Sequence, residues 1–203
     1  PSDRLSEEML FNDREGFVKA LNGVYIELNT NELYGRNLTA GALDVMGQYY
    51  SVASSSHAFY NYGGLVYTGN DEKALFDNMW QKCYAVIACC NTIIEKCDEN
   101  KAGLSPVWRG SIKGEALALR AMLHFDMLRL FGPLTSELDK ESIPYQTNSD
   151  QTVTPLLSGS EVVGLILDDL KNAVGLLKDT DPYFVEEEFS DTDLNYRRFR
   201  MNY

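Results

Sequence analysis

The sequence predicts an all-α protein, an antiparallel array of helices joined by long irregular loops. Two observations predict this class. Four long segments repeat apolar residues every three to four positions, as a helix does when one face packs against a neighbour. In contrast, no alternating run of more than four residues indicates a strand. With 203 residues, of which 44% are hydrophobic, the chain is long enough to bury a sizeable core, and residues 1–203 are expected to form a single domain.

The first two helices are each expected to begin at a capping box, in which two polar residues three positions apart satisfy the helix start. Asn12 and Glu15 precede one apolar face, formed by Phe17, Leu21, Val24 and Leu28. Thr68 and Asp71 precede a longer helix that extends to residue 97. Its apolar seam holds three of the four cysteines, Cys83, Cys90 and Cys97. Because these are seven residues apart, successive thiols are separated by ~10.5 Å of helical rise and cannot form disulfides within the helix.

The segment GEALALRAMLHFDMLRLFGPL (114–134) predicts the end of a central helix over 106–131. Ser105 suits its N-cap, Pro106 its first position, and Gly132 its end.

This central helix carries two apolar stripes, and a helix of that kind packs between other helices. We therefore expect it to lie against helix 70–97 on one side and helix 160–177 on the other. Its charged residues are expected to be structural, with partners on neighbouring helices or within the same helix: Glu115, Arg120, Asp126 and Arg129. Asp126 and Arg129 stand at i, i+3 and can pair directly.

Ser158 and Glu161 predict the start of the fourth helix, and a weaker pattern predicts a further helix over 32–47. Irregular stretches are expected between the helices, at 48–69, 132–157 and 179–195. Long helices of similar length in antiparallel pairs are typical of a tetratricopeptide-like array. No 34-residue repeat is legible, so any repeats are degenerate.

The charge of the chain makes nucleic acid an unexpected partner. Its net charge of −12 argues against nucleic-acid binding, which depends on Lys and Arg neutralising phosphates. No segment reaches the ~20 apolar residues of a membrane span. The chain starts at Pro1 without a Met, so we expect that its N-terminus was trimmed.

Signatures of catalysis and of cofactor binding are absent from the sequence, which contains no Walker A, G-x-G-x-x-G, H-E-x-x-H or G-x-S-x-G motif. Asp191, Asp193 and Asn195 match the first ligand positions of a calcium loop, but Tyr196 and Asn202 replace its glycine and its glutamate. We therefore expect no catalytic residue, no cofactor and no metal site.

The segment 44–70 is the best candidate for a ligand site. Between Asp44 and Asp71 it carries no formal charge, yet it is rich in Tyr, Ser, Asn and Gly. Flat rings with hydroxyl tips suit a neutral ligand with apolar faces and many hydroxyls, such as a sugar. The candidate glycan-binding residues are Asp44, Tyr49, Tyr50, Tyr60, Asn61 and Tyr62. Alternatively, these tyrosines pack the loop onto the helices.

Several motifs resemble the SusD/RagB family in the same order along the chain. GEALALRAMLHFDMLRLFGPL resembles the family's Glu-Ala-x-x-x-Arg-Ala … Arg-Leu-Phe-Gly … Pro-Leu signature. The other resembling segments are FNDREGFVKALNGVYIEL (11–28), GALDVMGQ (41–48), MWQKCYAVIACCNTII (79–94), SIPYQTNSD (142–150) and SEVVGLILDDLKNAVGLL (160–177).

The resemblance implies a tetratricopeptide-like scaffold in a cell-surface lipoprotein of the bacterial outer membrane. Such a protein binds an oligosaccharide or polysaccharide and passes it to a SusC-type TonB-dependent transporter. It implies attachment to the membrane only through an N-terminal lipidated Cys, which this chain lacks, and it indicates that the chain is an N-terminal domain of a longer protein. The starch-binding member uses a Trp and an Arg in the region matching 44–70. Neither occurs there in this chain, so starch specificity does not follow.

Two other functions stay open at this point. The same helical scaffold suits an adaptor that binds proteins or peptides, and thirty Asp and Glu residues leave room for a hydrolase with a carboxylate pair. Binding of a neutral oligosaccharide without turnover favours the glycan-binding function over both.

Overall fold

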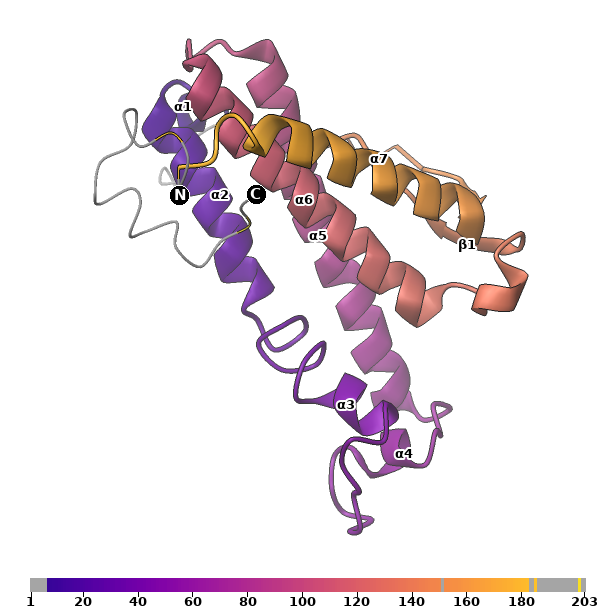
Figure 1. The fold of residues 1–203 in the computed structure, drawn as a ribbon. Helices are drawn as coiled ribbons and strands as arrows, with labels where there is room; N and C mark the ends of the chain where they lie inside the picture. The colour runs from indigo at the N-terminus through magenta and orange to yellow at the C-terminus, as the bar shows by residue number, and fades with distance from the viewer. Residues whose placement is uncertain (1–6, 151, 183–184, 186–200, 202–203) are drawn as a thin grey trace. The chain divides into compact units, whose positions relative to one another are not determined.

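The structure of this chain is a computed structural model that describes residues 7–150, 152–182, 185 and 201. It is largely helical, with one two-stranded sheet (Figure 1), which confirms the all-α class. The chain divides into two compact units, a bundle unit of residues 1–22 and 87–203 and a loop unit of residues 23–86. Both divisions fall inside helices, in α2 (Arg14–Leu28) and in α5 (Asn70–Glu99).

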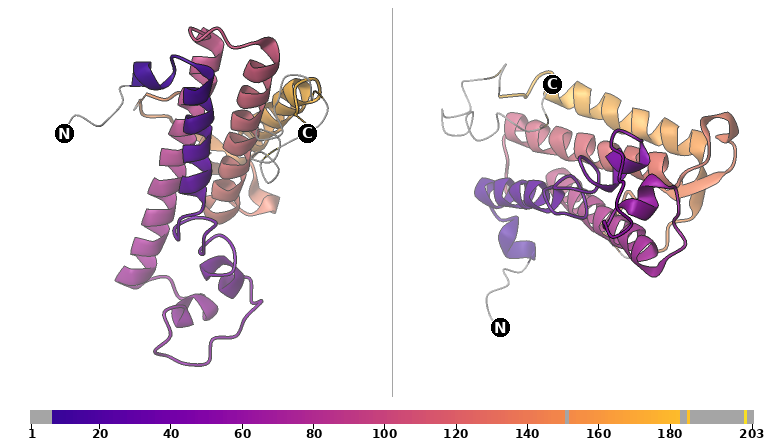
Figure 2. Two further views of the ribbon diagram at one scale, coloured as in Figure 1. Left: turned by 90° about the vertical axis from the view of Figure 1, so that its left-hand side faces the viewer. Right: turned by 90° about the horizontal axis from the view of Figure 1, so that it is seen from below.

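The bundle unit is built around α6 (Pro106–Phe131), the predicted central helix. Figures 1 and 2 show α7 (Gly159–Leu177) lying along it. Both apolar stripes of α6 are buried over most of their length, as expected of a helix packed on two sides. Gly114 lets α7 come close, because a Cβ at that position would lie 2.8 Å from Cγ of Leu177.

A buried polar network joins three helices of the bundle unit at Arg120. Its guanidinium donates two hydrogen bonds to the Asp169 carboxylate of α7, at 2.7 and 2.6 Å, and a third to Oδ1 of Asn91 in α5, at 2.9 Å. The Tyr145 hydroxyl donates to the same carboxylate at 2.6 Å. The predicted partner of Arg120 on a neighbouring helix is therefore Asp169. The i, i+3 pair of Asp126 and Arg129 is also present, with Arg129 Nε 3.1 Å from Asp126 Oδ1.

A short hairpin lies in the stretch 132–157, for which the sequence predicts irregular structure. After a 3-10 turn (η1, Thr135–Glu137), β1 (Glu141–Pro144) pairs antiparallel with β2 (Leu156–Ser158). These strands have four and three residues, too few to produce an alternating pattern in the sequence. Within β1 only Ile143 is buried, which explains the missing signal.

The helix starts agree with the sequence at some positions and differ at others. Ser105 caps α6 by accepting from Trp108 N, and Ser158 forms the predicted capping box with Glu161. The predicted cap at Asn12 is wrong by one residue, because it is Asp13 Oδ1 that accepts from Gly16 N, at 2.9 Å. The predicted cap at Thr68 is also displaced, since α5 begins at Asn70.

The loop unit corrects the prediction of a helix over 32–47. Turns occupy most of this stretch, and only α3 (Ala42–Met46) is helical. A side chain in this stretch bonds to the backbone locally: Thr39 Oγ1 lies 3.0 Å from Tyr34 O and 3.2 Å from Arg36 O, and donates to them. Such bonds compete with helix formation. The unit also holds one turn of helix, α4 (Tyr60–Gly63).

As their spacing along the helix predicts, Cys83, Cys90 and Cys97 form no disulfide with one another. Cys83, Cys90 and Cys97 are buried, whereas Cys89 is exposed. Burial raises the pKa of the Cys97 thiol to about 12, and it also raises the pKa of Cys90. These buried thiols are therefore protonated at neutral pH and act as small apolar groups in the core.

Candidate functional site

The segment 44–70 is held in the loop unit by one buried ring. Tyr62 is only 2% exposed, and its ring packs edge-on against Phe59 at 5.8 Å and Phe76 at 6.0 Å between ring centroids. Burial, followed by the nearby charges of Glu72 and Asp71, raises the pKa of its phenol. Tyr62 was predicted as a glycan contact, but the structure places it in the core of the unit, where it anchors the segment.

The other predicted tyrosines point outward. Tyr49 is 80% exposed, Tyr50 53% and Tyr60 42%. Asn61 is exposed and donates from Nδ2 to Oε1 of Glu72 at 2.8 Å, while Asp44 is half-buried in α3. Three of the candidate rings are therefore available to a ligand, and Asn61 is fixed in orientation beside them.

One pocket of about 490 Å³, here called the neutral pocket, opens beside Tyr50. None of the described residues that line it is an Asp, Glu, Lys or Arg. Its lining residues are Ala40, Val45, Tyr50, Ser51, Val52, Ala53, Ser54, His57 and Phe59. Three rings, those of Tyr50, His57 and Phe59, together with hydroxyls and apolar side chains, fit a ligand that combines apolar faces with hydroxyl groups.

A second pocket of about 700 Å³, here called the polar pocket, shares His57 and Phe59 with the first. It also receives side chains from outside the predicted segment, namely Arg36, Asp71, Glu72 and Leu75. The guanidinium of Arg36 lies over the Phe59 ring, 5.8 Å from its centroid. A ligand larger than one sugar can therefore contact both pockets across Phe59.

The chain between the pockets is held by local hydrogen bonds. His57 N donates to Ser54 O at 3.0 Å, and His57 Nδ1 accepts from Phe59 N at 3.1 Å. The rings of His57 and Phe59 are 5.8 Å apart. These contacts fix the Phe59 ring, which lines both pockets.

Sequence reasoning missed part of this site. Phe59 and His57 lie in the predicted segment, yet nothing in the composition distinguishes them from its other aromatic residues. Arg36 lies outside the segment and reaches the site only through the fold. Of the six predicted residues, Tyr50, Asn61 and Tyr62 line one of the two pockets, and Asp44, Tyr49 and Tyr60 do not.

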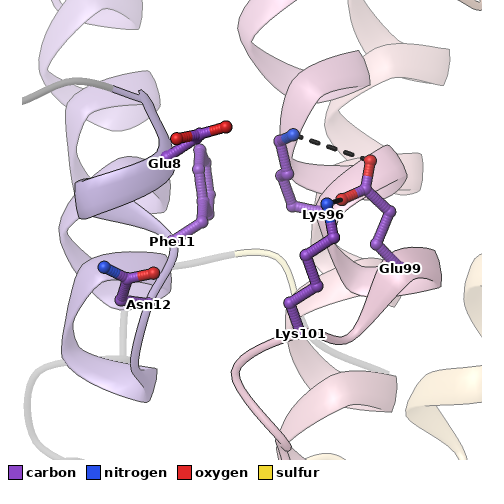
Figure 3. Close-up of a pocket in the computed structure, with 6 residues that line it drawn as sticks. All are labelled: Glu8, Phe11, Asn12, Lys96, Glu99 and Lys101. Carbon is purple, nitrogen blue, oxygen red and sulfur yellow. Dashed lines mark ion pairs between the residues drawn. The ribbon is translucent and has the colours of Figure 1, made fainter.

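A smaller pocket of about 180 Å³ lies in the bundle unit (Figure 3). Glu8, Phe11 and Asn12 form one side, and Lys96, Glu99 and Lys101 the other. Glu99 pairs with both lysines, at 3.6 Å to Lys96 and 3.0 Å to Lys101, and these partners lower its pKa. Because Glu99 already pairs with both lysines and the volume is small, this pocket suits an oligosaccharide less well than the two pockets of the loop unit.

Within the described residues, no group of three or more His, Cys, Asp or Glu side chains is arranged to hold a metal ion. The calcium-like pattern at Asp191, Asp193 and Asn195 lies outside the described residues. In the part of the chain that the structure describes, no helix is both long and apolar enough to cross a membrane.

The fold and the site define a helical scaffold protein with solvent-open, ring-lined pockets. Residues 5–190 match a SusD-like family model described as "Starch-binding associating with outer membrane". The chain therefore belongs to the SusD/RagB family, whose members are outer-membrane-associated carbohydrate-binding proteins.

Two curated relatives come from Formosa agariphila. SusD-like protein P38 is 34% identical over 96 residues, which cover 46% of this chain and 17% of that protein. SusD-like protein P2 is 26% identical over 139 residues, which cover 66% of this chain and 26% of that protein. The chain thus spans about a quarter or less of these curated relatives.

Solved structures of similar proteins have the same fold as this chain. A SusD-like carbohydrate-binding protein from Bacteroides vulgatus superposes with a TM-score of 0.66 and 26% identity, over 82% of this chain and 36% of that chain. A SusD homolog from Bacteroides thetaiotaomicron gives a TM-score of 0.63 and 20% identity, over 93% of this chain and 34% of that chain. These neighbours have the helical, tetratricopeptide-like fold predicted from the sequence.

Proposed function

We propose that this chain binds an oligosaccharide at the loop unit, across the neutral and polar pockets. The observation that carries the proposal is the exposed Tyr50 ring beside an uncharged pocket that Phe59 also lines. Stacking of a ring on the apolar face of a sugar excludes water, while Ser and Asn side chains exchange hydrogen bonds with its hydroxyls. Family membership supports the same ligand class.

The protein acts as a binding protein and not as an enzyme in this proposal. It is anchored at the outer-membrane surface by a lipid on an N-terminal Cys, and it delivers the bound glycan to a SusC-type TonB-dependent transporter. Its non-catalytic role predicts binding without product. Incubation with a bound oligosaccharide, followed by chromatography, should return that oligosaccharide intact, and release of shorter sugars would contradict the proposal.

The test of the site uses affinity electrophoresis through gels that contain neutral polysaccharides. We expect retardation of the wild-type chain by at least one of them. Tyr50→Ala should remove most of that retardation, because an exposed ring contributes on the order of 1 kcal/mol or more to a weak complex. The melting temperature should not change, since the side chain is more than half exposed.

Ile26→Ala is the matched control. Ile26 is an exposed apolar residue of the same unit and lines neither pocket. Its loss should leave retardation as in the wild type. If Tyr50→Ala and Ile26→Ala lost retardation equally, or if Tyr50→Ala melted at a lower temperature, Tyr50 would support the structure and would not be a ligand contact.

A protein-binding adaptor is the second candidate, and one feature favours it. Leu65 and Val66 are 59% and 48% exposed next to α4, and Leu65 has a φ of 55°, which a non-glycine residue rarely adopts. Aliphatic side chains of this kind suit a protein surface better than a sugar ring. A Leu65→Ser substitution that weakens binding to a purified SusC-type transporter and leaves glycan retardation unchanged would support this second role.

A further inference from the structure

The two pockets give a ligand very different electrostatic surroundings. In the part of the chain that the structure describes, no Asp, Glu, Lys or Arg lines the neutral pocket. The polar pocket is lined by two carboxylates, Asp71 and Glu72, and by one guanidinium, that of Arg36. An oligosaccharide that extends past Phe59 from one pocket into the other therefore meets net negative charge in the polar pocket. The described lining of the neutral pocket offers no cation to compensate it.

Among the described lining residues of the polar pocket, the charge of Arg36 is outnumbered by the two carboxylates. Arg36 directs its guanidinium carbon toward the Phe59 ring and donates from Nε to Oδ1 of Asn37 at 3.2 Å. Asp71 is exposed in the first turn of α5, and its charge contributes to the raised pKa of Tyr62. Because Tyr62 lines the polar pocket, the negative charge of Asp71 acts on groups inside that pocket.

The polar pocket has several hydrogen-bond acceptors beside the hydroxyls of Ser55, Ser56 and Tyr62. Glu72 is buried and, as a carboxylate, can only accept a hydrogen bond. The Asn61 amide must therefore turn its NH₂ group to Glu72, at 2.8 Å, which leaves its Oδ1 to the pocket. Asn61 Oδ1 and the Asp71 carboxylate both accept from hydroxyls. Carboxylate or sulfate groups on a glycan carry no proton to offer them.

From these contacts we infer that the polar pocket selects uncharged glycans and rejects those that carry carboxylate or sulfate groups, with Asp71 as a specificity-determining residue. The inference rests on the proposed glycan-binding function and names its substrate class. The net charge of −12 on the whole chain acts in the same direction on any polyanion.

The experiment compares dextran, a β-glucan and xylan, each beside its carboxymethyl derivative, in affinity electrophoresis at low ionic strength with the full chain. A glycan that retards the chain should bind about tenfold more tightly than its carboxymethyl form, which corresponds to about 1.4 kcal/mol. Added salt should narrow that ratio, because the Debye length falls to about 10 Å at 0.1 M.

Asp71→Asn should narrow the ratio of the two affinities by about threefold at low salt, because the amide no longer repels the carboxymethyl groups. Asp77→Asn is the matched control, since Asp77 is an exposed carboxylate of the same helix and lines neither pocket. An equal effect in both variants would assign the selectivity to net charge and overturn the role of Asp71.

Equal or tighter binding of the carboxymethyl form by the wild type would overturn the inference and leave the proposed function standing. Retardation by none of the glycans would overturn both. The two failures are therefore distinguishable.

Discussion

Burial and two hydrogen bonds favour the neutral form of the His124 ring. It is fully buried in α6, with Nδ1 2.9 Å from Arg120 O and Nε2 accepting from Gln146 N at 3.0 Å. These partners require the neutral ring with its proton on Nδ1. The Tyr145 ring stacks on it at 3.9 Å. Burial lowers the pKa of His124 to about 4, opposed by the hydrogen bond to Arg120 O and by the charge of Asp169.

This lowered pKa makes stability depend on pH in a defined direction. In the unfolded chain His124 takes up a proton near pH 6.5, whereas in the folded chain it stays neutral down to about pH 4. The unfolded state therefore binds more protons in this window, and stability falls as the pH falls through it, by about 3 kcal/mol. Urea unfolding from pH 7 to pH 4 should show this loss in the wild type and a smaller loss in His124→Gln. If the free energy of unfolding fell with pH by the same amount in the wild type and in His124→Gln, carboxylates alone would set the pH dependence of stability.

At the same scale, the candidate site shows what composition can predict. A run of tyrosines without charge indicates a segment whose residues line two pockets, because few other residues combine flat apolar faces with hydroxyls. It could not separate Tyr62, buried against Phe76, from the exposed Tyr49, since both are tyrosines in a neutral context. Nor could it assign Arg36, whose place beside Phe59 follows from the turns that replace the predicted helix 32–47.

At the scale of elements, the helices that were predicted well are those with two independent signals. α6 combines two apolar stripes with Ser105, Pro106 and Gly132 at its ends, and its bounds match the prediction. α7 likewise combines an apolar face with the Ser158–Glu161 capping box. The stretch 32–47 had a weak pattern alone, and its Asn, Thr and Gly residues form turns instead.

An ion pair of Arg120 and Asp169, both buried, links α6 to α7. Arg120→Ala would leave the Asp169 carboxylate buried without its cation, and removal of one partner of such a pair costs about 3–5 kcal/mol. Lys171→Ala is the control, because Lys171 forms an exposed pair with Asp168 on the same helix and should cost less than about 1 kcal/mol. The comparison is made by urea unfolding at pH 7. Similar midpoints for the two variants would show that water replaces the guanidinium of Arg120.

At the scale of the whole molecule, charge and hydropathy limit how the chain can meet a membrane. The net charge is −12, and none of the described helices can span a bilayer. Bacterial phospholipid surfaces that carry negative charge repel a protein of this sign. In the proposed function, a lipid on an N-terminal Cys attaches the protein to the outer membrane, and its negative charge is expected to add no attraction to an anionic surface.

A vesicle flotation experiment tests this attachment. The unlipidated chain of 203 residues, mixed with vesicles of phosphatidylethanolamine and phosphatidylglycerol, should remain in the aqueous fraction at both low and high salt. A single acyl chain supplies only marginal, reversible binding, with an association constant of about 10⁴ M⁻¹, and stable anchoring takes a second or third chain. The same chain fused behind a lipoprotein signal and a lipidated Cys should float with the vesicles. Flotation of the unlipidated chain would show that its own surface binds the membrane, and the lipid anchor would then be unnecessary.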